Sequence, residues 1–102
     1  MYRAGDQVDQ GEWLAELEAV AERLDLDAEA RSTAQDLFLS QLPDEDRSKR
    51  AVLAASVYAA ALLVGDQRAQ TEVADAADVS RLSIQSRWKD LLDGAGFRTP
   101  DW

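Results

Sequence analysis

The feature that most limits the possible folds is residues 51–64, a long segment that is almost entirely apolar. Its sequence is AVLAASVYAAALLV, in which Ser56 and the Tyr58 hydroxyl supply the polar groups. A helix that is apolar on every side is buried by neighbours on several sides, and its alanines allow those neighbours to approach closely. The segment is shorter than the roughly 20 residues of a membrane-spanning helix. It therefore predicts a central buried helix that opens at Ser48 and ends at a capping glycine, Gly65.

Two amphipathic patterns precede this segment. Apolar residues recur at three-and-four spacing over residues 12–24 and again over residues 28–42. The apolar positions are Trp13, Leu14, Leu17, Val20, Ala21 and Leu24 in the first pattern, and Ala30, Ala34, Leu37, Phe38 and Leu42 in the second. Asp27 is a predicted N-cap of the second helix, and Pro43 is predicted to end it. The polar residues 1–11 predict a flexible N-terminal segment.

Residues 70–92 have the spacing of a helix-turn-helix. A short first helix is followed by Asp78, in a turn that usually needs left-handed backbone, which Asp tolerates better than most residues. Ser80 is a predicted N-cap for a second helix over residues 81–92. The apolar positions of this hairpin, which we expect to be buried, are Val73, Ala74, Ala77, Val79, Ile84 and Trp88.

The other face of the second helix is basic and polar. Its side chains are Arg81, Ser83, Gln85, Arg87 and Lys89. Arginine and glutamine can reach base edges in a DNA major groove, and lysine suits phosphate. A helical hairpin with a solvated basic face gives the same pattern, so the spacing alone leaves both interpretations open.

Three blocks of sequence resemble a cyclin-type repeat of the archaeal transcription factor B family, the relatives of eukaryotic transcription factor IIB. Asp46-Arg47-Ser48 with residues 54–60 resembles the family's Gly-Arg-Ser-Pro loop and its Ala-Ala-x-x-Tyr-x-Ala helix. Residues 68–74 resemble Arg-Thr-Gln-x-Glu-Val-Ala. Residues 78–91 resemble Gly-Val-Thr-x-Val-Thr-Ile-Arg-x-Arg-Tyr-Lys-Glu-Leu. The resemblance covers roughly residues 12–93, which is one repeat.

The resemblance implies an all-α fold: a five-helix cyclin-like bundle with a C-terminal helix-turn-helix, in a single domain over residues 12–102. It also implies binding to double-stranded DNA in the major groove. The expected DNA-contacting residues are Arg81, Ser83 and Gln85 at bases, Arg87, Lys89 and Arg68 at phosphates, and Leu82. Position 85 is Gln where the family usually has a base-contacting Arg, and position 82 is Leu where a valine contacts DNA. Glutamine prefers adenine and arginine prefers guanine, so the family's preference for a promoter element upstream of the TATA box is open for this chain.

Residues that commonly carry out catalysis or bind metals are scarce. The sequence has no cysteine, no histidine, no glycine-rich phosphate loop and no G-x-S-x-G motif. We therefore expect no enzymatic activity, no cofactor and no metal site, and neither the family's zinc ribbon nor its second repeat within these 102 residues. The missing cysteines agree with a reducing, cytoplasmic location. The N-terminus lacks the apolar core of a signal peptide, and we expect no membrane association.

Charge is distributed unevenly along the chain, whose net charge is −9. Residues 1–46 contain 13 acidic and three basic side chains, whereas residues 47–102 contain seven acidic and eight basic ones. A haloarchaeal cytoplasm, where acidic surfaces are general, is one explanation, and two lysines against nine arginines agree with it. The other is an acidic front half, including Asp44-Glu45-Asp46, that docks on a basic protein or keeps DNA away. At molar salt the Debye length falls to about 3 Å, so long-range repulsion from DNA largely vanishes.

Three functions remain open at this point. The first is a DNA-binding transcriptional regulator built from one repeat, with a homodimer or a partner on DNA because a single hairpin has a small footprint. The second is a protein-interaction module that binds TATA-binding protein or another transcription partner without contacting DNA. The third is an enzyme, which the missing nucleophiles and metal ligands disfavour.

Overall fold

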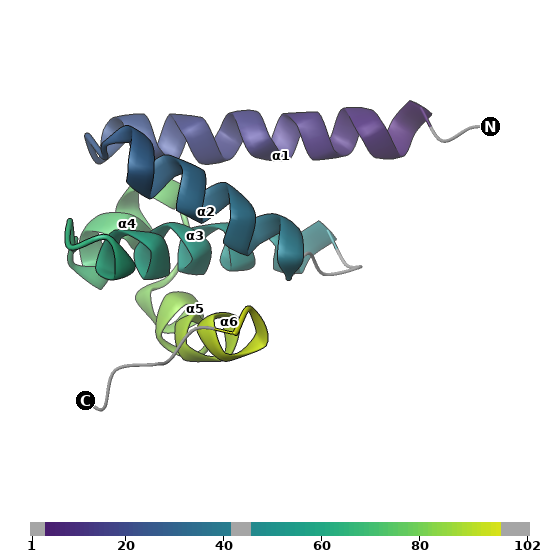
Figure 1. Ribbon diagram of the computed structural model, residues 1–102. Helices are drawn as coiled ribbons and strands as arrows, with labels where there is room; N and C mark the ends of the chain where they lie inside the picture. Colours follow the sequence, from purple (N-terminus) through teal and green to yellow (C-terminus); the bar gives the residue numbers. More distant parts are fainter. Residues whose placement is uncertain (1–3, 42–45, 97–102) are drawn as a thin grey trace.

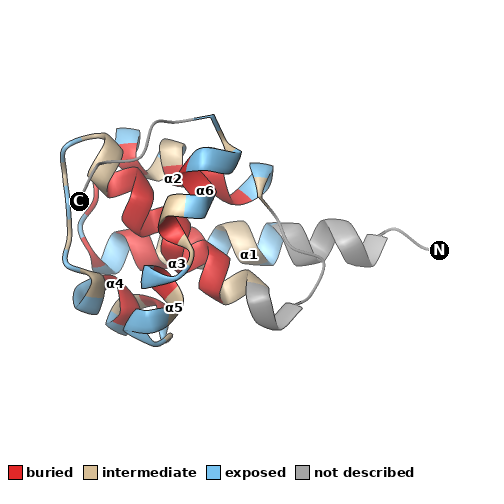
Figure 2. Ribbon diagram, turned by 90° about the horizontal axis from the view of Figure 1, so that it is seen from below, coloured by how far each residue is buried: buried red, intermediate tan, exposed pale blue. Residues whose placement is uncertain are grey.

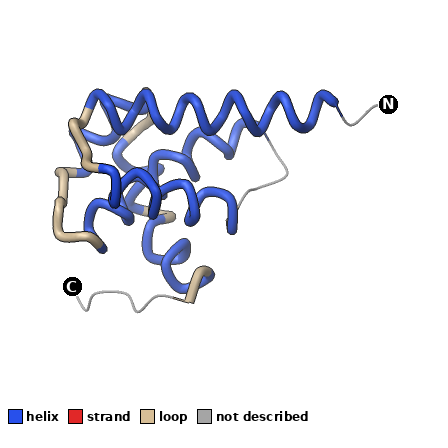
Figure 3. The backbone as a smooth tube through the Cα atoms, turned by 45° about the horizontal axis from the view of Figure 1, so that its top comes forward, coloured by secondary structure: helices blue, strands red, loops and turns tan. Residues whose placement is uncertain are grey.

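The computed structural model describes the backbone of residues 4–41 and 46–96, and the side chains of residues 11–41 and 49–96. Over these ranges the chain forms helices joined by short loops, with no strand (Figures 1 and 3). The helices are α1 (Ala4–Arg23), α2 (Ala28–Ser40), α3 (Asp46–Leu63), α4 (Gln70–Ala77), α5 (Arg81–Gln85) and α6 (Trp88–Gly94). The predicted all-α class is confirmed. All five expected helices are present, the fifth being divided into α5 and α6.

Helix α3 is the centre of the bundle, as its apolar sequence predicts. Every residue from 51 to 61 is buried, and all five other helices contact α3. In Figure 2 the buried residues are concentrated on α3 and on the sides of the helices that face it. The helix begins at Asp46, two residues before the predicted start at Ser48. None of the helices in the described part of the chain is long and apolar enough to cross a bilayer.

The predicted cap at the end of α3 is present. Gly65 has a φ of +81°, a left-handed conformation that costs glycine little. The Asp66 N–H donates to the Ala61 carbonyl at 2.8 Å and the Gly65 N–H donates to the Leu62 carbonyl at 3.3 Å. These two bonds form a Schellman motif, which satisfies carbonyls at the helix end and turns the chain toward α4.

Helices α1 and α2 differ from their predicted bounds. Helix α1 begins at Ala4, eight residues before the predicted start at Glu12, and extends past the bundle in Figure 1. The apolar stripe begins only at Trp13, so periodicity gave no signal for the earlier turns. Helix α2 begins after the predicted cap Asp27, whose carboxylate accepts from the Ala30 N–H at 2.9 Å.

The predicted end of α2 and the predicted flexible N-terminus reach into residues that the structure describes only in part. Helix α2 ends at Ser40, earlier than the predicted Leu42. Leu42, Pro43 and the first two residues of the acidic loop Asp44–Asp46 lie outside the described residues. Flexibility of residues 1–11 stays a prediction.

Candidate nucleic-acid interface

Helices α4 and α5 meet in a tight corner. Asp78 has a φ of +60°, so it takes the left-handed conformation predicted for the turn. Its N–H and that of Val79 both donate to the Ala74 carbonyl, at the end of α4. Ser80 then caps α5, accepting from the Ser83 N–H at 3.2 Å. The predicted helix-turn-helix is therefore formed by the local signals in its sequence.

The predicted apolar face of the hairpin is buried against α3. Val73, Ala77 and Ile84 are fully buried, Ala74 and Trp88 almost so, and Val79 packs on the core from a half-buried position. The Trp88 ring meets the Tyr58 ring edge-on, with centroids 5.4 Å apart and an angle of 72° between planes. Such aromatic pairs stabilise beyond their buried area, so this contact helps to hold the segment after α5 against α3.

The single helix predicted over residues 81–92 is interrupted. The Arg87 N–H donates to Ile84, three residues earlier, and α6 begins at Trp88. Two features accompany the break, one local and one tertiary. The Ser86 hydroxyl donates to the Ser83 carbonyl at 3.4 Å, an alternative to helical pairing, and Trp88 packs on Tyr58. The break separates the expected base-contacting residues on α5 from the expected phosphate-contacting residues after it.

The structure brings Arg81 and Gln85 together through a third residue, Gln70. The Gln70 Nε2 donates to Gln85 Oε1 at 2.6 Å, and the Arg81 Nη1 donates to Gln70 Oε1 at 3.2 Å. Arg81 and Gln85 are exposed and Gln70 is half-buried at the first position of α4. Sequence reasoning missed Gln70 because the contact joins two helices; its place in the block resembling Arg-Thr-Gln was the available signal.

The other two α5 candidates differ in their surroundings. Leu82 is 66% exposed, which is unusual for a leucine in this chain, since 44% at Leu39 is the next value among the described large apolar residues. The Ser83 hydroxyl lies 3.0 Å from the Ser80 hydroxyl, within the N-terminal cap of α5. Leu82 thus offers an apolar contact at the surface, while Ser83 is partly engaged in the cap.

The three cations expected at phosphates lie outside α5. Arg87, in the break, donates to the Ser86 hydroxyl at 3.4 Å. The Lys89 Nζ lies 5.5 Å from the centroid of the Trp88 ring.

Arg68 is different, because its guanidinium joins the loop before α4 to the end of α1. Its nitrogens donate to the Leu24 carbonyl at 3.1 Å, to the Asp25 carbonyl at 3.3 Å and to the Asp66 carboxylate at 2.7 Å.

A second contact set holds the end of α4 in place. Arg23 donates to the Ala76 carbonyl at 2.7 Å and Arg50 donates to the Ala77 carbonyl at 3.1 Å. Both guanidinium groups lie near one Glu16 carboxylate oxygen, at 3.9 and 3.0 Å respectively. Positive charge at a helix C-terminus is favourable, so these arginines support the orientation of the hairpin. Sequence reasoning did not find them.

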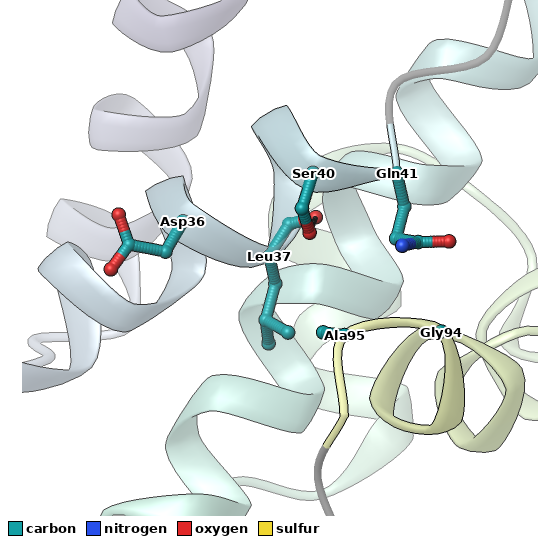
Figure 4. A pocket seen from close by; sticks show the side chains of 6 residues that line it. All are labelled: Asp36, Leu37, Ser40, Gln41, Gly94 and Ala95. Atoms are coloured by element: carbon teal, nitrogen blue, oxygen red, sulfur yellow. Dashed lines mark hydrogen bonds between the residues drawn. The ribbon is translucent and has the colours of Figure 1, made fainter.

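Outside the hairpin, the described residues offer few possible metal-binding or ligand-binding sites. No group of three or more His, Cys, Asp or Glu side chains in this part of the chain could hold a metal ion. A pocket of about 340 Å³ lies between the C-terminal ends of α2 and α6. Its lining residues are Asp36, Leu37, Ser40, Gln41, Gly94 and Ala95 (Figure 4). In Figure 4 the Asp36 side chain points away from α6, and Gln41 extends over Gly94.

Comparison with known proteins identifies the family. Residues 10–94 match the family model described as the transcription factor TFIIB repeat. The chain belongs to this family. The TFIIB repeat is a cyclin-like all-α fold, so the fold implied by the three sequence blocks is confirmed.

The similar proteins are archaeal transcription initiation factors. The chain is 36% identical over 76 residues to transcription initiation factor IIB 4 of Halobacterium salinarum. The match covers 72% of this chain and 23% of that protein. It is 37% identical over 54 residues to transcription initiation factor IIB of Pyrococcus horikoshii. This match covers 53% of this chain and 18% of that protein. The matched part therefore spans less than a quarter of these relatives' length. These relatives are initiation factors, not enzymes.

Proposed function

We propose that this TFIIB repeat is a DNA-binding transcriptional regulator that places α5 in a major groove of double-stranded DNA. The observation that carries the proposal is the Arg81–Gln70–Gln85 cluster, which is linked by hydrogen bonds and lies at the surface of a docked helix-turn-helix. The second helix of such a hairpin is the one that enters the groove. Guanidinium and carboxamide groups are the side chains that pair best with base edges.

The proposed contacts fall into two groups. Arg81, Leu82, Ser83 and Gln85 would face bases from α5, and Arg87 and Lys89 would face phosphates from the chain after it. Arg68 would contact a phosphate with a guanidinium that already donates to Leu24, Asp25 and Asp66. Because α5 has only five residues, one hairpin covers few base pairs. We infer that a homodimer or a partner on DNA supplies the remaining affinity.

The experiment is a fluorescence-anisotropy titration of genomic promoter fragments in about 2 M KCl, where charge repulsion is screened. Saturable binding to DNA alone is expected, and the double variant Arg81→Ala/Gln85→Ala should abolish it. Gln67→Ala, at an exposed glutamine outside the cluster, is the control and should bind as the wild type does. Binding by the double variant equal to that of the wild type would contradict the proposal.

A second candidate is a module that binds a basic protein surface, with TATA-binding protein the partner suggested by the family. The observation in its favour is an acidic, exposed surface on α1, α2 and their connection. Its carboxylates belong to Glu12, Glu22, Asp25, Asp27, Glu29 and Asp36. Under this alternative, anisotropy would rise only when TATA-binding protein is present. The Arg81→Ala/Gln85→Ala variant would then bind as well as the wild type, whereas Glu29→Lys/Asp36→Lys would not.

A further inference from the structure

The hydrogen bonds around Gln70 have a fixed direction. A guanidinium can only donate, so the Gln70 atom facing Arg81, at 3.2 Å, must be the carbonyl oxygen Oε1. Gln70 therefore turns its Nε2 toward Gln85, and the Gln85 atom that accepts it, at 2.6 Å, must be Oε1. Arg81 thus orients the Gln85 carboxamide through Gln70, although a lone exposed amide could take either of two orientations.

This orientation decides what Gln85 can offer to a ligand. Its Nε2 retains two N–H donors directed away from Gln70, and its Oε1 retains a second lone pair. In the major groove, adenine presents the N7 acceptor beside the N6 amino donor, which matches this pair. Guanine presents two acceptors, and cytosine presents a donor without an acceptor, so each satisfies only half of the oriented carboxamide.

We propose that Gln70 is a positioning residue that holds Gln85 in the orientation needed to recognise adenine. The inference rests on the proposed DNA-binding function and specifies its base preference. Leu82 supports the same class of target. It lies three residues before Gln85 on α5, so the two side chains are neighbours, and an exposed leucine can contact the methyl group of thymine. The target is therefore double-stranded DNA with an A·T pair under α5.

The test is selection of double-stranded DNA from a fully randomised library by the wild-type chain, followed by affinity measurement on single-base variants of the enriched site. We expect one position where adenine is preferred over cytosine by about tenfold, as for a bidentate pair. In Gln70→Glu the new carboxylate can only accept, so it binds the Gln85 Nε2 and turns Oε1 outward. The preference for adenine over cytosine at that position should then fall to about twofold or less.

The controls separate positioning from charge and folding. Gln67→Glu adds the same negative charge on the loop before α4 and should weaken all sites equally while keeping the adenine preference. Gln70→Ala removes the bond without adding charge, so the Gln85 amide can take either orientation, and the preference should fall by about half, to about fivefold. Thermal unfolding of each variant shows whether the domain is intact, and a ratio between two DNA sites does not change with the fraction of folded protein.

The outcomes also separate this inference from the proposed function. If the wild type enriches a site and Gln70→Glu and Gln70→Ala keep its full base preference, the positioning role is overturned and DNA binding stands. A wild-type site without a preferred adenine also overturns the inference alone. If the folded wild type enriches no sequence, the proposed DNA recognition fails, and this inference fails with it.

Discussion

Ser56 is a polar residue buried in the core at α3. Its side chain is fully buried, and its hydroxyl has no hydrogen-bond partner among the described residues. Burying an unsatisfied hydroxyl costs about 1–3 kcal/mol, so Ser56→Ala should raise the free energy of unfolding by about 1 kcal/mol or more. Urea denaturation measures the change.

The control for this prediction removes the effect of helix propensity. Ser32 is an exposed serine inside α2, and Ser32→Ala should raise stability by only about 0.5 kcal/mol. If Ser56→Ala stabilises no more than Ser32→Ala, the buried hydroxyl has a partner or costs nothing, and the prediction is wrong.

The left-handed backbone conformation of Asp78 also affects the stability of the fold. A non-glycine residue at a φ of +60° pays a steric cost of about 1 kcal/mol that glycine avoids. Asp78→Gly should therefore stabilise the chain by about 0.5 kcal/mol. The net gain is smaller than the steric cost because glycine loses more conformational entropy on folding. Asp75→Gly, at an exposed right-handed position in α4, should instead lower stability by a few tenths of a kcal/mol. If chemical denaturation shows that both substitutions raise, or both lower, the free energy of unfolding, this explanation of the turn is wrong.

At the scale of elements, the hairpin depends on contacts from α1 and α3. Arg50 donates to the Ala77 carbonyl and to Glu16, and its guanidinium lies 5.5 Å from the Trp13 ring centroid. The Arg50 side chain is 37% exposed, so solvent screening reduces the contribution of these bonds to stability. Arg50→Met, which keeps the aliphatic stem, should lower the free energy of unfolding by about 1 kcal/mol.

A double-mutant cycle with Glu16→Gln checks that the two residues act together. Because Glu16 and Arg50 share one ion pair, the double variant should lose less stability than the two single variants combined. Additive losses in chemical denaturation would show that the pair contributes no coupling.

The elements also show what local sequence can and cannot specify. The burial of α3, the caps at Asp27, Gly65 and Ser80, and the buried hairpin face were predicted because each depends on periodicity or on a few adjacent residues. The division of the predicted 81–92 helix and the Gln70–Gln85 bond were missed. The break accompanies the packing of Trp88 on Tyr58, a residue of another helix, and the bond joins side chains of two successive helices. Helical periodicity along one segment records neither.

The start of α1 was missed for a different reason. Its first turns come before the amphipathic stripe, so the periodic signal began about two turns late. The candidate DNA-contacting residues were chosen because arginine, glutamine and lysine follow helical spacing, and their contact with DNA stays a prediction. Which of them contact one another was visible only in the folded chain.

For the whole molecule, the proposed binding to DNA would depend on the net charge of the chain. The net charge is −9, and the proposed phosphate contacts come from Arg87, Lys89 and at most Arg68. Each phosphate neutralised contributes about −0.9 to the slope of log K against log salt concentration. We therefore expect a slope of about −3 or shallower, and about one unit shallower in Lys89→Gln. A slope steeper than about −6 in salt-dependent anisotropy would contradict this small contact set.

The hairpin of α4 and α5 is the surface that we propose contacts DNA. The most direct measurement is a ¹H–¹⁵N correlation spectrum of the folded chain, titrated with the duplex that it selects. We expect the largest amide shifts within residues 70–89, including the Gln70 and Gln85 side-chain amides. Shifts confined to the acidic surface of α1 and α2, with residues 70–89 unchanged, would contradict this proposal.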